Sequence, residues 1–186
     1  MGNSSEHADW PLLREGAVNV YSDQGLFDEA RSGLEALDYL RLDFQVASRE
    51  SFIKEMSAAL EWEASFGYAP WTGHLDAFDE GIVEFPFRTH DRAVITISRF
   101  ERLVEADDGW ALGLLDVFQH AAWYYLAAGK RLIVLLQTDD KSFRTPRLGG
   151  KSARRDMREQ MQSFQKFDNH CRKSHVSRQG APPWRR

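Results

Sequence analysis

Residues 131–137 read RLIVLLQ, and this short run decides the fold class of the chain. Its apolar residues follow one another without the alternation of a half-exposed strand, so both faces of the strand are expected to be covered. Strands of that kind occur in parallel sheets that carry helices on both sides. The run is also far too short to span a bilayer. It therefore predicts one strand of a small, mainly parallel sheet.

Three further segments upstream have the character of strands. Residues 39–46 (YLRLDFQV) alternate between apolar and polar side chains, and residues 93–97 (AVITI) are rich in β-branched residues. Residues 17–21 (AVNVY) fit a short strand. Apolar residues at helical spacing predict helices over residues 24–37, 49–62 (capped by Ser48) and 107–128 (ended by Gly129). This alternation predicts an α/β fold in which helices flank the sheet.

Residues 66–85 (FGYAPWTGHLDAFDEGIVEF) are the most informative part of the sequence about function. Helical spacing predicts a short helix with a core-facing side formed by Leu75, Phe78, Ile82 and Phe85. The opposite flank carries the acids Asp76, Asp79, Glu80 and Glu84, and no Lys or Arg lies between residues 66 and 87. Like charges at this spacing destabilise a helix slightly. The undiluted acidic flank favours a surface for a positively charged partner, and the alternative is ordinary solvated surface.

An aromatic loop leads into this acidic helix. It combines Phe66, Tyr68 and Trp71 with the turn-forming residues Gly67, Pro70 and Gly73. Rings on such a loop are not all expected to be buried in a core. Exposed aromatic residues beside charge are typical of a binding hot spot.

The charge of the chain is divided unevenly along its length. Residues 151–186 hold ten Lys or Arg and three acids, which leaves 14 bases and 25 acids in residues 1–150. An acidic body attracts basic partners and repels nucleic acid. The basic segment is interpreted as a solvated tail. It could instead bind a phosphate backbone, or dock on the acidic helix and mask it.

The domain organisation follows from these patterns. We expect a loose N-terminus over residues 1–16, one domain over residues 17–140, and a basic, partly disordered tail over residues 141–186 that contains a polar helix near 152–173. The single cysteine, Cys171, excludes an internal disulfide and a multi-cysteine metal site. The polar start MGNSSEHADW does not fit a signal peptide, so a cytoplasmic location is expected.

Residues 39–138 resemble the barstar-like family of ribonuclease inhibitors. The resemblance rests on LDAFDE (75–80), SRFE (98–101) and LDVF (115–118), and on their order between the predicted strands. Residues 10–37, which comprise WPLLREGAVNVY and the helix predicted after it, resemble an N-terminal extension found in longer barstar-like proteins. The resemblance implies a three-layer α/β fold, here with an extra N-terminal strand–helix unit.

The resemblance also implies a function and a set of contact residues. The chain would not be an enzyme and would need no cofactor; it would bind a basic, secreted-type ribonuclease one-to-one and fill its active site with the acidic helix. The implied contacts are Asp76 and Glu80 as principal acids, Asp79 and Glu84 as supporting acids, and Tyr68, Trp71, Gly73, His74 and His120.

The sequence also departs from the family pattern. Glu80 stands where the family has Asp, His74 stands where it has Asn, and His120 stands at a position that is often acidic. The long helix over 107–128 is about one turn longer than in the family, and its Trp123, Tyr124 and Tyr125 are expected to pack within the fold.

Two other functions use the same residues. A metal-dependent or acid–base enzyme could be built from His74, Asp76, Asp79, Glu80 and His90, because carboxylates and imidazole bind divalent ions. No established metal or phosphate motif supports that reading. The domain could also bind a protein that is not a nuclease.

Overall fold

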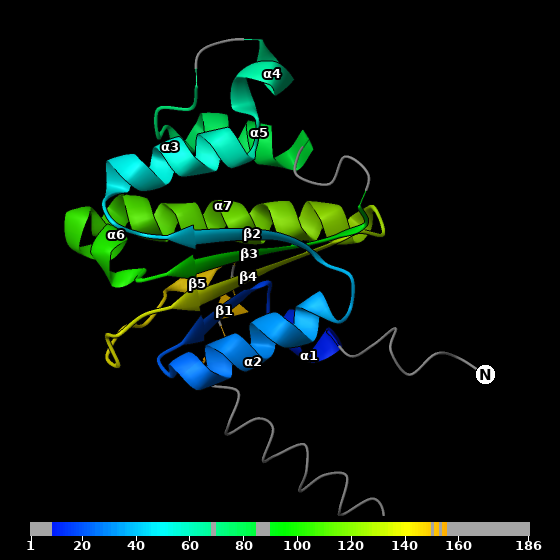
Figure 1. Cartoon of the computed structure of the whole chain (residues 1–186), viewed down its shortest axis with the longest axis vertical. Coiled ribbons are helices and arrows are strands. Elements are labelled where there is room, and N and C mark those ends of the chain that lie inside the picture. The colour runs from blue at the N-terminus through cyan, green and yellow to red at the C-terminus, as the bar shows by residue number, and fades with distance from the viewer. Residues whose placement is uncertain (1–8, 68–69, 85–89, 150, 153, 156–186) are drawn as a thin grey trace, which may run out of the picture. The chain divides into compact units, whose positions relative to one another are not determined.

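A computed structural model of the chain describes residues 9–67, 70–84, 90–149, 151–152 and 154–155 (Figure 1). The chain divides into two units, Met1–Arg155 and Asp156–Arg186, and every described residue lies in the first. The predicted tail helix near residues 152–173 is contradicted at its start, where Ser152 and Arg154–Arg155 lie in short strands, and beyond residue 155 it lies outside the described residues.

The first unit alternates strands and helices. Its elements are α1 (Trp10–Leu13), β1 (Val18–Tyr21), α2 (Gln24–Glu35), β2 (Leu40–Gln45), α3 (Arg49–Ala59), α4 (Trp62–Phe66), α5 (Leu75–Glu84), β3 (Arg92–Ser98), α6 (Glu101–Ala106), α7 (Asp108–Ala127), β4 (Arg131–Gln137), β5 (Arg147–Leu148), β6 (Lys151–Ser152) and β7 (Arg154–Arg155). Among the described residues, no helix is both long and apolar enough to cross a membrane.

The main sheet has the strand order β2-β3-β4-β1-β7, and all four neighbouring pairs are parallel. A separate antiparallel pair joins β5 to β6. Strand β4 lies in the middle of the sheet, and its apolar residues from Leu132 to Leu136 are fully buried. The prediction that RLIVLLQ forms a strand covered on both faces is confirmed.

Helices cover both faces of the sheet (Figure 1). Helices α3, α5 and α7 lie on one side, where they share a core with residues such as Val134 and Ile95. Helices α1 and α2 lie on the other side, where α2 buries Phe27, Ala30 and Leu34. The predicted three-layer α/β fold with an additional N-terminal strand and helix is therefore confirmed.

Side-chain caps begin three of the helices, and one of the three is the predicted cap Ser48. The Oγ of Ser48 accepts from the Ser51 amide at 3.1 Å, and the Oδ1 of Asp107 accepts from the Trp110 amide at 3.0 Å. Asp23 caps α2 in the same way. Each cap satisfies an amide that has no partner within its helix.

The helix predicted over residues 49–62 is divided in two. Helix α3 ends at Ala59, and Glu61 adopts a left-handed backbone with φ 45°. The turn directs the Trp62 ring into the core, where it is 1% exposed. Helix α6 and the β5–β6 pair were not predicted, because these elements are too short to show periodicity.

Residues 9–13 lie in the segment that was expected to be loose, but they are ordered by contacts with the sheet. Asp9 is 1% exposed, and both of its carboxylate oxygens accept from Nη1 of Arg131, at 2.6 and 2.7 Å. The hydroxyl of Tyr39 donates to the same carboxylate. Leu12 of α1 is also buried. The segment was expected to be loose because it is polar, but one of its polar residues, Asp9, is held in a buried ion pair.

The Tyr39 phenol should make stability fall at alkaline pH. Burial, the hydrogen bond to Asp9 and the negative charge of Asp9 raise the pKa of Tyr39 above its ordinary value. Above about pH 10 the unfolded chain ionises this phenol while the folded chain keeps it protonated, so stability falls by about 1.4 kcal/mol per pH unit. We expect Tyr39→Phe to make the decline shallower in urea unfolding between neutral pH and pH ~11. An unchanged slope would contradict the assignment.

Candidate functional site

The acidic flank of α5 faces solvent because the opposite side of the helix is fixed in the core. Phe78 and Ile82 have no exposed surface, and the Phe78 ring meets the Phe118 ring of α7 edge-on at 5.6 Å. The hydroxyl of Tyr125 donates to the Ile82 carbonyl. This packing sets the rotation of α5 and leaves Asp76 and Glu80 exposed, one turn apart. The predicted division of the helix is confirmed for these residues, whereas Phe85 and the Glu84 side chain lie outside the described residues.

The ring of Trp71 is buried, which corrects the expectation that it lies exposed on the loop. It is 4% exposed and stacks on the Phe78 ring at a centroid distance of 4.5 Å. Its Nε1 donates to the His74 carbonyl at 2.8 Å, and its amide donates to Oγ of Ser57 at 3.0 Å. These bonds fold the loop back on itself. Trp71 therefore supports the site from within, and Tyr68 lies outside the described residues.

Gly73 shapes the same loop through its backbone. It adopts φ +97°, which residues with a side chain rarely adopt, and its carbonyl accepts from Nε1 of Trp110 at 2.7 Å. A Cβ at this position would lie 2.6 Å from Cδ1 of Ile53. The next residue, His74, is exposed at the start of α5. Gly73 is thus required for the close approach of the loop to α3 and α7.

Gly81 lets α4 pack directly against α5. A Cβ at Gly81 would lie 2.4 Å from Cη2 of Trp62, a ring that has almost no room to move. We expect Gly81→Ala to lower the free energy of unfolding by about 1–3 kcal/mol, since overpacking outweighs the gain in helix propensity. The measurement is urea unfolding.

Gly33 provides the matched control for that substitution. It lies within α2, and nothing stands within 4 Å of a Cβ added there. Gly33→Ala should therefore raise the free energy of unfolding by about 0.5–1 kcal/mol. Stabilisation by both substitutions would contradict the tight packing at Gly81.

A side-chain contact between His120 and Asp79 joins α5 to α7 at the edge of the acidic flank. Nδ1 of His120 lies 2.7 Å from Oδ1 of Asp79, and the two side chains are 60% and 34% exposed. The two residues are 41 positions apart in sequence. Both were predicted site residues, but no sequence pattern indicated that they would be partners. The contact places His120 at the same surface as Asp76 and Glu80.

The five residues of the alternative enzyme hypothesis do not form one cluster among the described residues. His90 lines a pocket of about 400 Å³ with Asp38, Asp91 and Arg92, and the α5 acids do not line it. Within the described ranges, no group of three or more His, Cys, Asp or Glu side chains is arranged to hold a metal ion. Of the five residues in that reading, Asp79 contacts His120 instead of His74 or His90.

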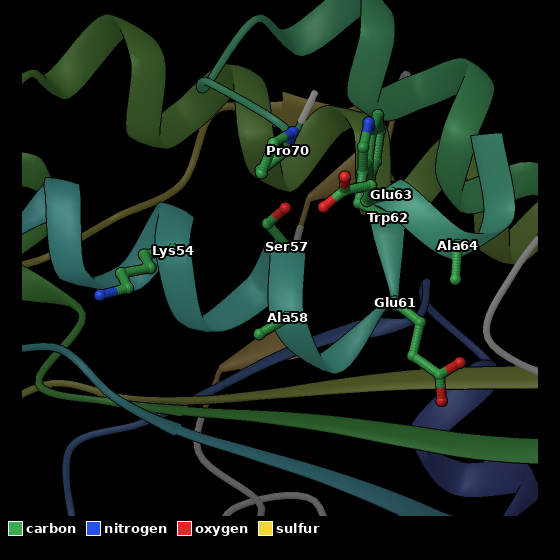
Figure 2. A pocket seen from close by; sticks show the side chains of 8 residues that line it. All are labelled: Lys54, Ser57, Ala58, Glu61, Trp62, Glu63, Ala64 and Pro70. Atoms are coloured by element: carbon green, nitrogen blue, oxygen red, sulfur yellow. The ribbon is translucent and has the colours of Figure 1, made fainter. Parts of the chain in front are cut away.

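A second pocket, of about 560 Å³, lies beside the loop at the junction of α3 and α4 (Figure 2). Trp62 and Pro70 line it together with Ser57, and Glu61 and Glu63 contribute carboxylates. Asp76, Asp79 and Glu80 line neither pocket. The acidic flank is therefore an exposed helix face that lines neither of these two pockets.

Comparison of the chain with models of known protein families, with curated proteins and with solved structures finds no match. The function is therefore argued from the side chains and geometry of the chain itself.

Proposed function

We propose that this protein is a barstar-like inhibitor that binds a basic ribonuclease one-to-one and occupies its active site with α5. The observation that carries the proposal is the exposure of Asp76 and Glu80 on one face of α5. No Lys or Arg lies between residues 66 and 87 to neutralise them. A ribonuclease site that holds RNA phosphates must present cationic groups. Two carboxylates on a rigid helix can replace those phosphates.

The arrangement of the elements supports the same proposal. Apart from the short helices α4 and α6, the order β2, α3, loop, α5, β3, α7, β4 corresponds to the order expected from the resemblance, and β2, β3 and β4 are neighbours in the sheet in that order. The part of the loop from Trp71 to His74 is held by the hydrogen bonds of Trp71 and Gly73, so this part needs little further ordering on binding. A preorganised surface binds more tightly than a mobile one.

The charge of the protein supports fast association with such a partner. Residues 1–150 carry 25 acids against 14 bases, and this field attracts a basic protein. We place the complex in the cytoplasm of the producing cell, which the inhibitor would protect before the nuclease is secreted.

The direct test is a titration of the full chain against a purified basic ribonuclease of the barnase type, with RNA cleavage as the readout. We expect cleavage to fall linearly and to end at one inhibitor per enzyme, with association that slows as salt rises. Undiminished cleavage at a large molar excess would refute the proposal for this class of nuclease.

A further inference from the structure

Two aromatic side chains of α7 are exposed, although they were expected to pack within the fold. Trp123 is 42% exposed and Tyr124 is 56% exposed, whereas Tyr125 is 4% exposed and is bonded to α5. Leu126 beside them is 43% exposed. Among the described residues, three of the four large apolar side chains that are exposed lie in this one stretch. Such a concentration on a folded domain indicates a contact surface.

The exposed rings lie next to the acidic flank. Tyr124 is four residues after His120, so the two share a face of α7, and Trp123 is three residues after it. His120 is the residue that contacts Asp79 of α5. Helices α5 and α7 also pack against each other on the same side of the sheet, and Figure 1 draws α5 above α7. The Asp79–His120 contact therefore connects the acids of α5 to the rings of α7 in one surface.

The Trp123 ring is positioned by the segment that follows β5. Gly149 has no side chain where the ring lies, because a Cβ there would stand 2.9 Å from Cη2 of Trp123. The Gly149 amide donates to Oδ1 of Asp116 at 2.9 Å, which fastens this segment to α7 about two turns before Trp123. A ring held against a fixed backbone loses little freedom when it binds a partner.

We propose that Trp123 and Tyr124 extend the surface of Asp76, Asp79 and Glu80, and that the combined surface binds an arginine-rich face of a protein. The inference rests on the proposed function, because it assigns these rings to the contact with the same basic nuclease. Arginine pairs with carboxylates and also stacks on the faces of Trp and Tyr. One kind of partner residue can therefore bind both the acids of α5 and the rings of α7. Trp and Tyr are also the residues that most often dominate binding energy.

RNA is the other ligand that stacks on exposed rings. The acids of α5 stand next to these rings and repel a phosphate backbone, so the charge favours a cationic protein. RNA therefore enters the test as a competing outcome.

The first experiment compares variants of the full chain in ribonuclease inhibition. We expect Trp123→Ala/Tyr124→Ala to weaken binding about tenfold or more, mainly through faster dissociation. Trp10→Ala is the matched control, because Trp10 is 52% exposed on α1, on the other side of the sheet, and it should bind as the unchanged chain does. Equal thermal midpoints would show that both variants fold.

The outcomes separate this inference from the proposed function. Inhibition by the unchanged chain that the double variant retains in full would overturn the inference and leave the proposed function standing. Failure of the unchanged chain to inhibit would overturn the proposed function. Whether the combined surface binds arginine is then tested by a second measurement that uses no nuclease.

The second measurement titrates the full chain with a hexa-arginine peptide and follows the indole N–H signals by NMR. We expect the Trp123 signal to shift while the Trp10 signal does not, and the shift to shrink in Asp76→Asn/Glu80→Gln. Equal shifts at both indoles would overturn the inference. A larger response of Trp123 to a short single-stranded RNA than to the peptide would overturn it as well.

Discussion

Removing the charge of Asp76 or Glu80 is expected to abolish tight inhibition. Each carboxylate would meet a cation of the nuclease site away from water, and truncating one partner of such a pair costs about 2–5 kcal/mol. This corresponds to binding that is weaker by about 30-fold to a few thousand-fold. Asp76→Asn and Glu80→Gln keep the shape of each side chain, so their loss of binding reports charge alone. The measurement is the inhibition constant from RNA cleavage.

The control for this prediction is an exposed acid on the other side of the sheet. Glu29 is exposed on α2, which lies opposite α5 and α7 (Figure 1). Glu29→Gln should change the dissociation rate by less than about twofold and alter association only slightly, as expected for a charge outside the contact. If all three variants weaken binding equally, the effect comes from net charge and α5 does not enter the nuclease site.

Removal of Arg131 should have the largest effect on stability. Its side chain is 20% exposed, and its guanidinium contacts both oxygens of Asp9, whose side chain is 0% exposed. Arg131→Met leaves that carboxylate buried without its cation, which costs about 3–5 kcal/mol. The hydrogen bond from Tyr39 alone cannot balance a full charge. Urea unfolding at neutral pH measures the loss.

Arg41→Met supplies the control because Arg41 makes comparable ion pairs at the surface. Arg41 contacts Glu35 at 2.8 Å and Asp43 at 2.5 Å, and these acids are 63% and 42% exposed. Exposed pairs contribute about 0–1 kcal/mol, so the control should be nearly as stable as the unchanged chain.

A double substitution separates the charge effect from lost packing. Arg131→Met/Asp9→Leu replaces the buried pair by apolar side chains and should recover much of the stability lost in Arg131→Met. If the single and double variants are equally unstable, the loss comes from packing, and the buried pair is not what holds residues 9–13 against the sheet.

Local patterns were sufficient to predict the sheet and the division of α5. Strand β4 was predicted from an apolar run without alternation, and its observed bounds are the predicted ones. Phe78 and Ile82 were assigned to the core and Asp76 and Glu80 to the surface because side-chain spacing fixes which residues share a helix face. These properties depend on residues a few positions apart, so the sequence alone determines them.

Tertiary structure decided which rings and charges are accessible. The loop position of Trp71 led to the expectation that its ring is exposed. The ring is buried instead, because it stacks on Phe78 and donates a hydrogen bond to the His74 carbonyl. Helix α7 is apolar around most of its circumference, so periodicity cannot identify the side that α5 and the residues near Gly149 leave uncovered at Trp123 and Tyr124.

Two contacts between side chains far apart in the sequence show the same limit more directly. Asp9 and Arg131 are 122 residues apart, and Asp79 and His120 are 41 apart. No local spacing relates such residues, because their contact depends on how whole elements pack. The sequence by itself determined the α/β fold and the acidic face of α5. Only the tertiary structure showed that Trp123 and Tyr124 are exposed on the helix that packs against α5, because exposure is set by what the neighbouring elements leave uncovered.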